Sequence, residues 1–118
     1  MITVYAYAGC DTCRKALKWL QARGIAHEVR AIRETPPTVA ELRTALMAAD
    51  GELRRLFNVS GQDYRALQLK DKLPVMRVEA ALALLAQNGN LVKRPMVVGG
   101  GVALNGFDEA AWTQALLR

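Results

Sequence analysis

The chain has 118 residues, of which 52% are hydrophobic and 23% are charged, with a net charge of +5. This length and composition suit one globular domain and exclude an intrinsically disordered protein. No apolar run reaches the roughly 18 residues of a membrane-spanning helix, so we expect no membrane association. The positive charge is compatible with an anionic substrate, an acidic protein partner or a nucleic acid, and equally with a solvated helix face.

The first predicted unit is a strand, a helix and a second, parallel strand. Residues 2–7 form a short β-branched and aromatic run that is typical of a buried strand. Apolar residues then recur at helical spacing over residues 13–20, and Gly24 is suited to end this helix. Residues 27–32 alternate as a second strand. Together these elements predict a βαβ unit with a right-handed crossover.

The middle third of the chain is predicted to be helical. Two prolines interrupt the chain, and then Thr38 with Glu41 forms a capping-box pattern that begins a helix ending near residue 49. Further helical segments are expected over residues 52–57, 64–69 and 77–86. This block is too short to carry a core of its own. We therefore interpret residues 38–90 as a helical insertion within one domain that spans residues 1–118.

The end of the chain returns to strands. Residues 96–98 and 102–104 are apolar runs on either side of three glycines, which predicts an antiparallel hairpin. Asp108 is suited to cap a final helix that carries Trp112. The order β-α-β, helical insertion, β-β-α predicts the α/β class, with a thioredoxin-like fold and a four-stranded mixed sheet.

The only two cysteines of the chain, Cys10 and Cys13, stand in a C-x-x-C motif between the first strand and the first helix. The segment after Met1 lacks the pattern of a secretory signal peptide, which predicts a cytoplasmic protein. Structural disulfides are rare in that compartment, so the pair indicates a catalytic, sensing or metal-binding role.

The two cysteines are predicted to differ in environment. Cys10 falls at the start of the helix, where unpaired N–H groups and the helix dipole stabilise a thiolate. Arg14 and Lys15 add positive charge nearby, and Asp11 partly offsets it. Cys13 falls on the apolar stripe of the helix. We therefore expect Cys10 to be an exposed nucleophile and Cys13 a half-buried resolving thiol; the alternative for Cys13 is a small core residue.

A metal site is not expected. Structural zinc usually has four ligands of the cysteine and histidine types. Besides its two cysteines, the chain has a single histidine, His27, on the predicted second strand.

The dipeptide Arg94-Pro95 precedes the predicted hairpin. A peptide bond before proline can be cis, and a cis bond here would place the loop beside the start of the first helix. Arg94 would then project toward Cys10 and bind an anionic ligand through its paired N–H donors. The alternative is a turn proline with an arginine at the surface.

Three stretches of the sequence carry a resemblance to a known family: YAGCDTCRKALKWL, LFNVSGQDYRAL and LVKRPMVV. They resemble the family that joins glutaredoxin-coupled arsenate reductases with the Spx regulators, over nearly the whole chain. The resemblance implies a thioredoxin-like domain with a helical insertion. It also implies that Cys10 is the nucleophile and that Arg94, beside a cis Pro95, contacts an anion.

The sequence departs from the arsenate reductase pattern, which has one loop cysteine and three arginines around the oxyanion. This chain also carries Cys13, and it has Asn58 and Gly106 where two of the arginines would fall. Losing two cationic groups should weaken the binding of arsenate sharply, so arsenate is not the expected substrate. The C-x-x-C motif fits better the reductase-like members, for which glutathione-linked thiol chemistry is implied.

Two functions follow from this reading. The first is a monomeric thiol–disulfide reductase with Cys10, Cys13 and Arg94 as catalytic residues and glutathione as a co-substrate, without a bound cofactor. Its predicted substrate contacts are Thr12, Arg14, Lys93 and Pro95. The second is a Spx-like regulator whose disulfide state alters its docking to RNA polymerase. Direct binding of nucleic acid is not expected, because no helix-turn-helix or aromatic–basic pattern is present.

Overall fold

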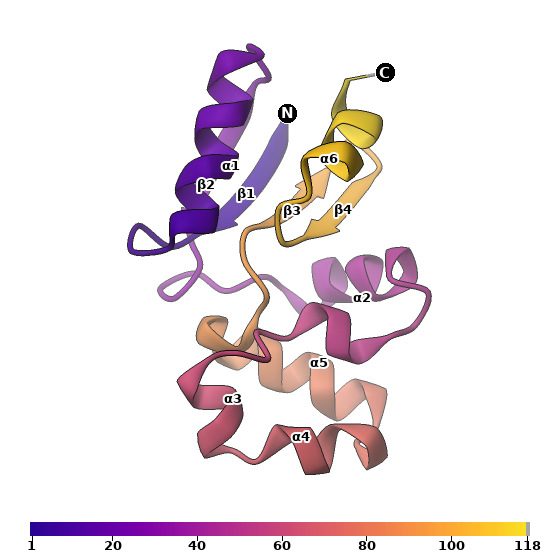
Figure 1. Cartoon of the computed structure of the whole chain (residues 1–118). Helices are drawn as coiled ribbons and strands as arrows, with labels where there is room; N and C mark the ends of the chain where they lie inside the picture. The colour runs from indigo at the N-terminus through magenta and orange to yellow at the C-terminus, as the bar shows by residue number, and fades with distance from the viewer. Residues whose placement is uncertain (118) are drawn as a thin grey trace.

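The structure is a computed structural model that describes residues 1–117. Its centre is a four-stranded sheet in the order β2-β1-β3-β4 (Figure 1). The strands are β1 (Ile2–Ala6), β2 (His27–Ala31), β3 (Met96–Gly99) and β4 (Val102–Asn105). β1 and β2 are parallel, whereas β1 with β3 and β3 with β4 are antiparallel, so the predicted mixed sheet is confirmed.

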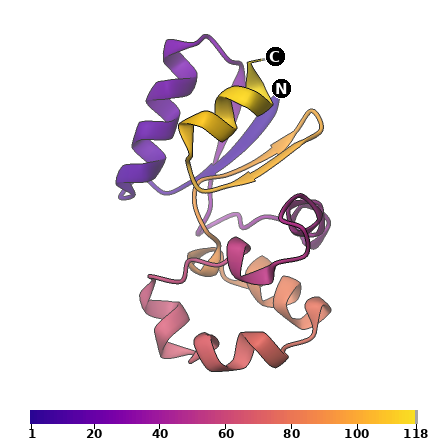
Figure 2. The ribbon, with the colours of Figure 1, turned by 45° about the vertical axis from the view of Figure 1, so that its right-hand side comes forward.

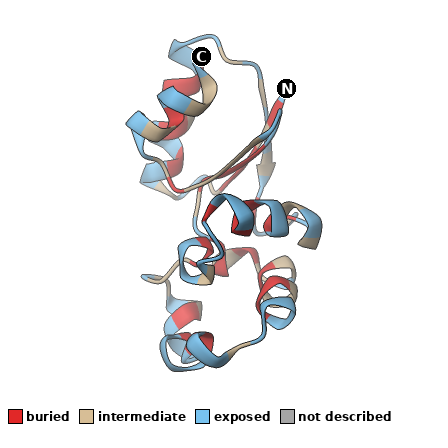
Figure 3. Cartoon of the chain, turned by 90° about the vertical axis from the view of Figure 1, so that its right-hand side faces the viewer, coloured by how far each residue is buried: buried red, intermediate tan, exposed pale blue. Residues whose placement is uncertain are grey.

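Helices cover both faces of the sheet because side chains alternate along each strand. Val4 and Val97 face α1 (Asp11–Ala22) and α6 (Glu109–Leu116), which lie side by side on one face (Figures 1 and 2). Between these two helices, the rings of Trp19 and Trp112 pack edge to face, with their centres 6.0 Å apart. The opposite face, which includes Tyr5, packs on α2 (Val39–Ala48). Buried positions accordingly lie along the inner side of each helix (Figure 3).

The helical insertion begins with the predicted capping box. The hydroxyl of Thr38 accepts from the N–H of Glu41 at 3.1 Å, and the Glu41 carboxylate accepts from the N–H of Thr38 at 2.9 Å. After α2 come a 3₁₀ turn and the helices α3 and α4, then a second 3₁₀ turn, α5 and a third 3₁₀ turn. Their bounds are Leu53–Leu56, Gln62–Ala66, Leu69–Lys72, Leu73–Val75, Val78–Gln87 and Gly89–Leu91.

The helical segment predicted over residues 64–69 is present only in part, because residues 67 and 68 lie between α3 and α4. Residues 64–69 do not form a single piece, because the chain turns at Gln68, whose φ of 55° lies in the left-handed region. The turn separates α3 from α4 and redirects the chain toward α5. A left-handed glutamine gives no glycine or asparagine signal in the sequence.

The insertion shares its core with the sheet. Tyr5 of β1 lies in one cluster with residues of α2 and α5, and its hydroxyl donates to the Glu41 carboxylate at 2.7 Å. A bridge between Phe57 and Val92 ties the segment that enters the insertion to the segment that leaves it. Hydrogen bonds on both sides of this bridge, Asn58 N–H to the Leu91 carbonyl and Lys93 N–H to the Leu56 carbonyl, measure 2.7 and 2.8 Å. In this antiparallel bridge, residue 58 lies opposite residue 91 and residue 56 lies opposite residue 93.

The hairpin is formed as predicted. β3 and β4 are joined by Gly100 and Gly101, whose φ values of 59° and 79° make the tight turn that suits such hairpins. Within residues 1–117, no helix is both long enough and apolar enough to cross a membrane.

Candidate active site

Cys10 caps the N-terminus of α1. Its backbone is extended, with φ −98° and ψ 118°, and its Sγ accepts from the backbone N–H of Cys13 at 3.2 Å. The side chain thereby satisfies one of the four N–H groups that a helix start leaves unpaired. A negative charge on this sulfur would also interact favourably with the dipole of the 12-residue helix.

The surroundings of Cys10 favour its thiolate. Partial burial is the strongest single influence and opposes ionisation. It is outweighed by hydrogen bonds from the thiol and the backbone N–H of Cys13 and by the charge and hydrogen bond of Arg94, so that the pKa of Cys10 is lowered. Because the thiolate is the attacking form of cysteine, this environment activates Cys10 as a nucleophile.

Cys13 has the opposite environment. Only 1% of its surface is exposed, and it packs in the cluster that contains Ala16 and Trp19 between α1 and the sheet. Burial, followed by its hydrogen bond to Cys10, raises the pKa of Cys13 to about 12. Both cysteines are free in the structure, and they form an unequal pair, because the pKa of Cys10 is lowered and the pKa of Cys13 is raised.

Arg94 reaches the site from the other end of the chain. The bond between Arg94 and Pro95 is cis, and the Pro95 carbonyl accepts from the N–H of Gly106 at 2.8 Å. The Arg94 guanidinium lies over the ring of Tyr7, with its carbon 5.1 Å from the ring centre. These contacts hold the charge of Arg94 close enough to lower the pKa of Cys10.

A cavity of about 370 Å³ opens at Cys10. Its lining comes from the start of α1, the segment after the bridge, the residues before β3 and the loop after β4. These residues are Cys10, Thr12, Asn58, Lys93, Arg94, Asn105, Gly106, Phe107 and Asp108. The structure thus brings together Cys10, the two residues Lys93 and Arg94 that precede β3, and both positions at which the arsenate reductase pattern would place further arginines.

Of the predicted substrate contacts, Thr12 and Lys93 line this cavity and Arg14 and Pro95 do not. Arg14 pairs with the Asp11 carboxylate and donates to the Ala8 carbonyl at 2.7 Å, which holds its guanidinium against the loop instead of the cavity. Pro95 does not line the cavity itself, but its carbonyl accepts a hydrogen bond from Gly106, which does.

Three lining residues, Asn105, Phe107 and Asp108, were missed from the sequence as cavity residues. Asp108 was predicted only as a helix cap, which it is, since its carboxylate accepts from the N–H of Ala110 at 3.1 Å. All three residues lie within two positions of Gly106 in the sequence. Because position 106 belongs to the anion site of the resembled family, this proximity could have identified them as cavity residues.

A second, smaller cavity of about 180 Å³ adjoins the first and shares Asn58 and Arg94 with it. Arg33 lines it and donates to the Asn90 side chain at 2.6 Å. The guanidinium carbon of Arg33 lies 4.0 Å from the centre of the Tyr7 ring, which Arg94 also contacts. Two guanidinium groups are therefore held near the site by one aromatic ring. Within the part of the chain that the structure describes, no three histidine, cysteine or acidic side chains cluster as metal ligands.

Comparisons with known proteins place these features in a family. The sequence model of the ArsC family matches residues 5–115. The uncharacterized protein YusI of Bacillus subtilis is 42% identical over 108 residues, which cover 92% of each chain. The global transcriptional regulator Spx of Enterococcus faecalis is 28% identical over 110 residues, which cover 92% of this chain and 81% of Spx.

The fold comparison agrees with the sequence comparison. An ArsC family related protein from Bacteroides fragilis superposes with a TM-score of 0.89 at 41% identity, and the match covers 96% of this chain and 95% of that one. The predicted thioredoxin-like α/β class is confirmed. The suspected relationship to arsenate reductases and Spx regulators is confirmed as well: the chain belongs to the ArsC family.

Proposed function

We propose that the protein is a thiol–disulfide reductase in which Cys10 attacks a disulfide or a glutathione-linked sulfur. The observation that carries this proposal is the unequal cysteine pair. Cys10 is half-buried at a helix start with a lowered pKa, and Cys13 is buried one turn later with a raised pKa. A thiol with a lowered pKa beside a thiol with a raised pKa is the arrangement that two-step disulfide exchange requires.

In the first step the Cys10 thiolate attacks one sulfur of the substrate disulfide. A bond forms between Cys10 Sγ and that sulfur, the substrate S–S bond breaks, and the departing thiolate takes a proton from solvent. Arg94 and the start of α1 hold negative charge at the site where the departing sulfur develops it. Lys93 in the same cavity adds a third positive group.

In the second step Cys13 attacks the Cys10 sulfur of this mixed disulfide. Cys13 loses its proton, the Cys10–Cys13 disulfide forms, and the reduced substrate thiol departs with that proton. Part of the raised pKa of Cys13 comes from the neighbouring Cys10 thiolate. That part disappears once Cys10 is bonded to the substrate, so Cys13 is activated only after the first step. Two glutathione thiols then supply two electrons, which restore both cysteines and yield glutathione disulfide.

Glutathione fits the charges of the site better than arsenate does. Asn58 and Gly106 are neutral where arsenate reductases have arginines, so Arg94 is the arginine that remains of that three-arginine pattern. Arg33, Lys93 and Arg94 are spread over the two adjoining cavities. Separated cations suit the two carboxylates of a tripeptide better than a single compact oxyanion. The proposal places this chemistry in the cytoplasm, where a glutathione pool is available, and requires no resident cofactor.

The test is the reduction of a glutathione–cysteine mixed disulfide by the purified protein with glutathione as the electron donor. Cys10→Ser should abolish turnover. Cys13→Ser should still perform the first step and accumulate a glutathione adduct at Cys10, seen by mass spectrometry. No turnover by the wild-type protein at any glutathione concentration would disprove the proposal.

A second candidate is a redox-gated regulator, which the similarity to Spx over 92% of this chain favours. In that function the Cys10–Cys13 disulfide changes a surface that docks on RNA polymerase. A pull-down with the reduced protein and with the oxidised protein decides between the candidates. Recovery of a polymerase subunit with one form only supports the regulator, and recovery with neither form excludes it.

A further inference from the structure

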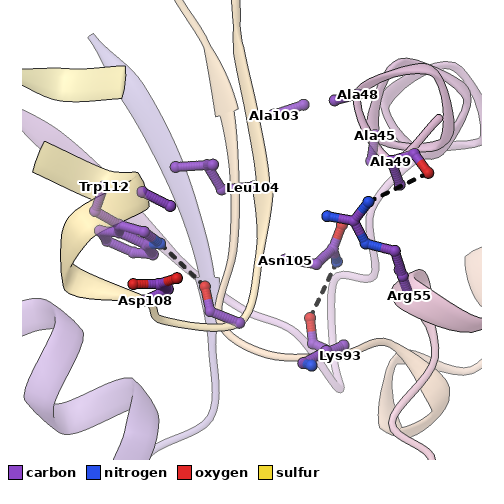
Figure 4. A pocket seen from close by; sticks show the side chains of 12 residues that line it. Ala45, Ala48, Ala49, Arg55, Lys93, Ala103, Leu104, Asn105, Asp108 and Trp112 are labelled. Atoms are coloured by element: carbon purple, nitrogen blue, oxygen red, sulfur yellow. Dashed lines mark hydrogen bonds between the residues drawn. The ribbon is translucent and has the colours of Figure 1, made fainter. Parts of the chain in front are cut away.

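β4 is the outermost strand on its side of the sheet, and its free edge lies at the floor of a groove. The groove is a cavity of about 270 Å³ between α2 on one side and α6 on the other (Figure 4). Alanines from all three elements line it: Ala45, Ala48 and Ala49 from α2, Ala103 from β4 and Ala111 from α6. Walls of alanine leave room for another backbone beside β4.

Two residues of β4, Ala103 and Asn105, direct their backbone N–H and C=O groups toward this groove. In an antiparallel pair, hydrogen-bonded and non-hydrogen-bonded residue pairs alternate. The Gly106 N–H donates to the Pro95 carbonyl at 2.8 Å, so this pair is hydrogen-bonded. Because the two kinds of pair alternate from there along the hairpin, Ala103 and Asn105 belong to non-hydrogen-bonded pairs with β3. Their N–H and C=O groups point away from β3. Within residues 1–117 these outward groups have no hydrogen-bond partner.

The other edge of the sheet is protected in a way that β4 is not. β2 carries Glu28 and Arg30, which pair at 3.2 Å, and charges of this kind discourage the addition of a strand. The four residues of β4, Val-Ala-Leu-Asn, carry no charge. The edge that remains suited to pairing is therefore the one in the groove.

The groove leads into the cavity at Cys10. Lys93, Asn105, Gly106 and Asp108 line both. A strand paired with β4 at Ala103 and Asn105 would thus continue past the end of β4 into the space in front of Cys10.

From this geometry we infer that the β4 edge binds an extended segment of a polypeptide substrate as an added strand and delivers its oxidised cysteine to Cys10. The inference rests on the thiol chemistry proposed above and narrows the substrate class to proteins that carry a mixed disulfide. Main-chain pairing supplies affinity with little dependence on sequence, which suits a reductase of many proteins.

Hydrogen exchange tests the binding directly. The Cys13→Ser protein is coupled chemically at Cys10 either to glutathione or to an eight-residue peptide with a terminal cysteine. Two peptides, with the cysteine at either end, cover both strand directions. With one peptide, exchange of the Ala103 and Asn105 amides should slow at least tenfold relative to the glutathione adduct. Equal exchange in all adducts would overturn the inference, and because coupling is chemical, this result is independent of turnover.

Kinetics give a second test with a matched pair of variants. Ala48→Phe fills the groove, whereas Ala40→Phe alters an exposed position of α2 outside it. The measured quantity is kcat/KM for a glutathionylated peptide divided by kcat/KM for the glutathione–cysteine disulfide. We expect this ratio to fall at least tenfold in Ala48→Phe and to stay unchanged in Ala40→Phe; an unchanged ratio in both contradicts the inference.

The remaining outcomes separate the two proposals. If the wild-type protein reduces neither substrate, the proposed function fails, and the exchange experiment alone decides about the β4 edge. If the free protein sediments as a dimer whose Ala103 and Asn105 amides are already protected, a second copy occupies the edge and the inference is overturned.

Discussion

Arg94 and Arg14 show that an arginine near a cysteine in sequence can matter less than one that is 84 positions away. Arg14 is engaged by Asp11 and Ala8, whereas the charge of Arg94 acts on Cys10. The opposite charges at positions 11 and 14 stand three apart on a helix, a spacing at which such side chains pair. That signal was present in the sequence, and it explains why Arg14 lies outside the cavity.

The first prediction concerns this difference. Arg94→Gln should raise the pKa of Cys10, because it removes a positive charge and a hydrogen bond that favour the thiolate. The measurement is the rate of alkylation by iodoacetamide against pH, which follows the thiolate fraction. In the wild-type protein the rate should reach its plateau at a lower pH than for an ordinary thiol, whose pKa is about 8.5. Arg14→Gln is the matched control and should leave the profile in place; a shift of equal size in both variants contradicts the prediction.

The second prediction concerns Cys13 and the stability of the fold. Because its folded pKa is raised, the unfolded chain loses the Cys13 proton first as the pH increases. The free energy of unfolding should therefore decline above the unfolded pKa of about 8.5 and continue to do so toward pH 12, with a slope of up to about 1.4 kcal/mol per pH unit. The lowered pKa of Cys10 acts in the opposite direction at lower pH.

Urea unfolding at pH 8 and at pH 10 measures the effect. Cys13→Ala lacks the titrating group, so the free-energy difference between wild type and variant should shrink at the higher pH. Lysines and tyrosines titrate in both proteins and cancel in this difference. A difference that is the same at both pH values would show that Cys13 ionises equally easily in the folded and unfolded states.

At the scale of single elements, α2 illustrates what local sequence determines. Its capping box was recognised from Thr38 and Glu41 alone, and both reciprocal hydrogen bonds are present. The third prediction is that Thr38→Ala lowers the free energy of unfolding by about 1 kcal/mol. Thr44→Ala, an exposed position within the same helix, should cost nothing, because alanine is the stronger helix former there. Equal losses for the two variants in urea unfolding would contradict the assignment.

Elements determined by distant contacts were harder to predict. The strands, the hairpin and the inward position of Cys13 followed from periodicity and glycines, because those patterns are local. The break between α3 and α4 at Gln68 did not, since a left-handed φ at a glutamine has no signal in the local sequence. Nor could the sequence show the groove at β4. The alanines of α2 are also ordinary helix residues, and only the packing of α2 against β4 turns them into a wall.

For the molecule as a whole, the shared core of sheet and insertion has an energetic consequence. Tyr5 of the sheet and Leu82 of α5 are fully buried members of one cluster. The fourth prediction is that Leu82→Ala lowers stability by about 2–5 kcal/mol and does so for sheet and insertion together. The single domain predicted over residues 1–118 requires this cooperativity.

The two tryptophans provide the readout. Trp19 and Trp112 both lie between the sheet and the helices α1 and α6, so their fluorescence reports that half of the molecule. Far-ultraviolet circular dichroism reports all helices. The two signals should shift to the same lower urea midpoint in Leu82→Ala. A dichroism loss that precedes an unchanged fluorescence transition would show that the insertion unfolds by itself.

The bridge between Phe57 and Val92 gives the insertion a closed base. The cavity takes Asn58, Lys93 and Arg94 from immediately beside that base, while α3, α4 and α5 lie between the two ends of the bridge. These three residues are therefore attached to this base, and α4 lines neither the cavity at Cys10 nor the smaller one that adjoins it. Substitutions on the exposed side of α4 should therefore alter the surface of the insertion without moving the residues that line the cavity at Cys10.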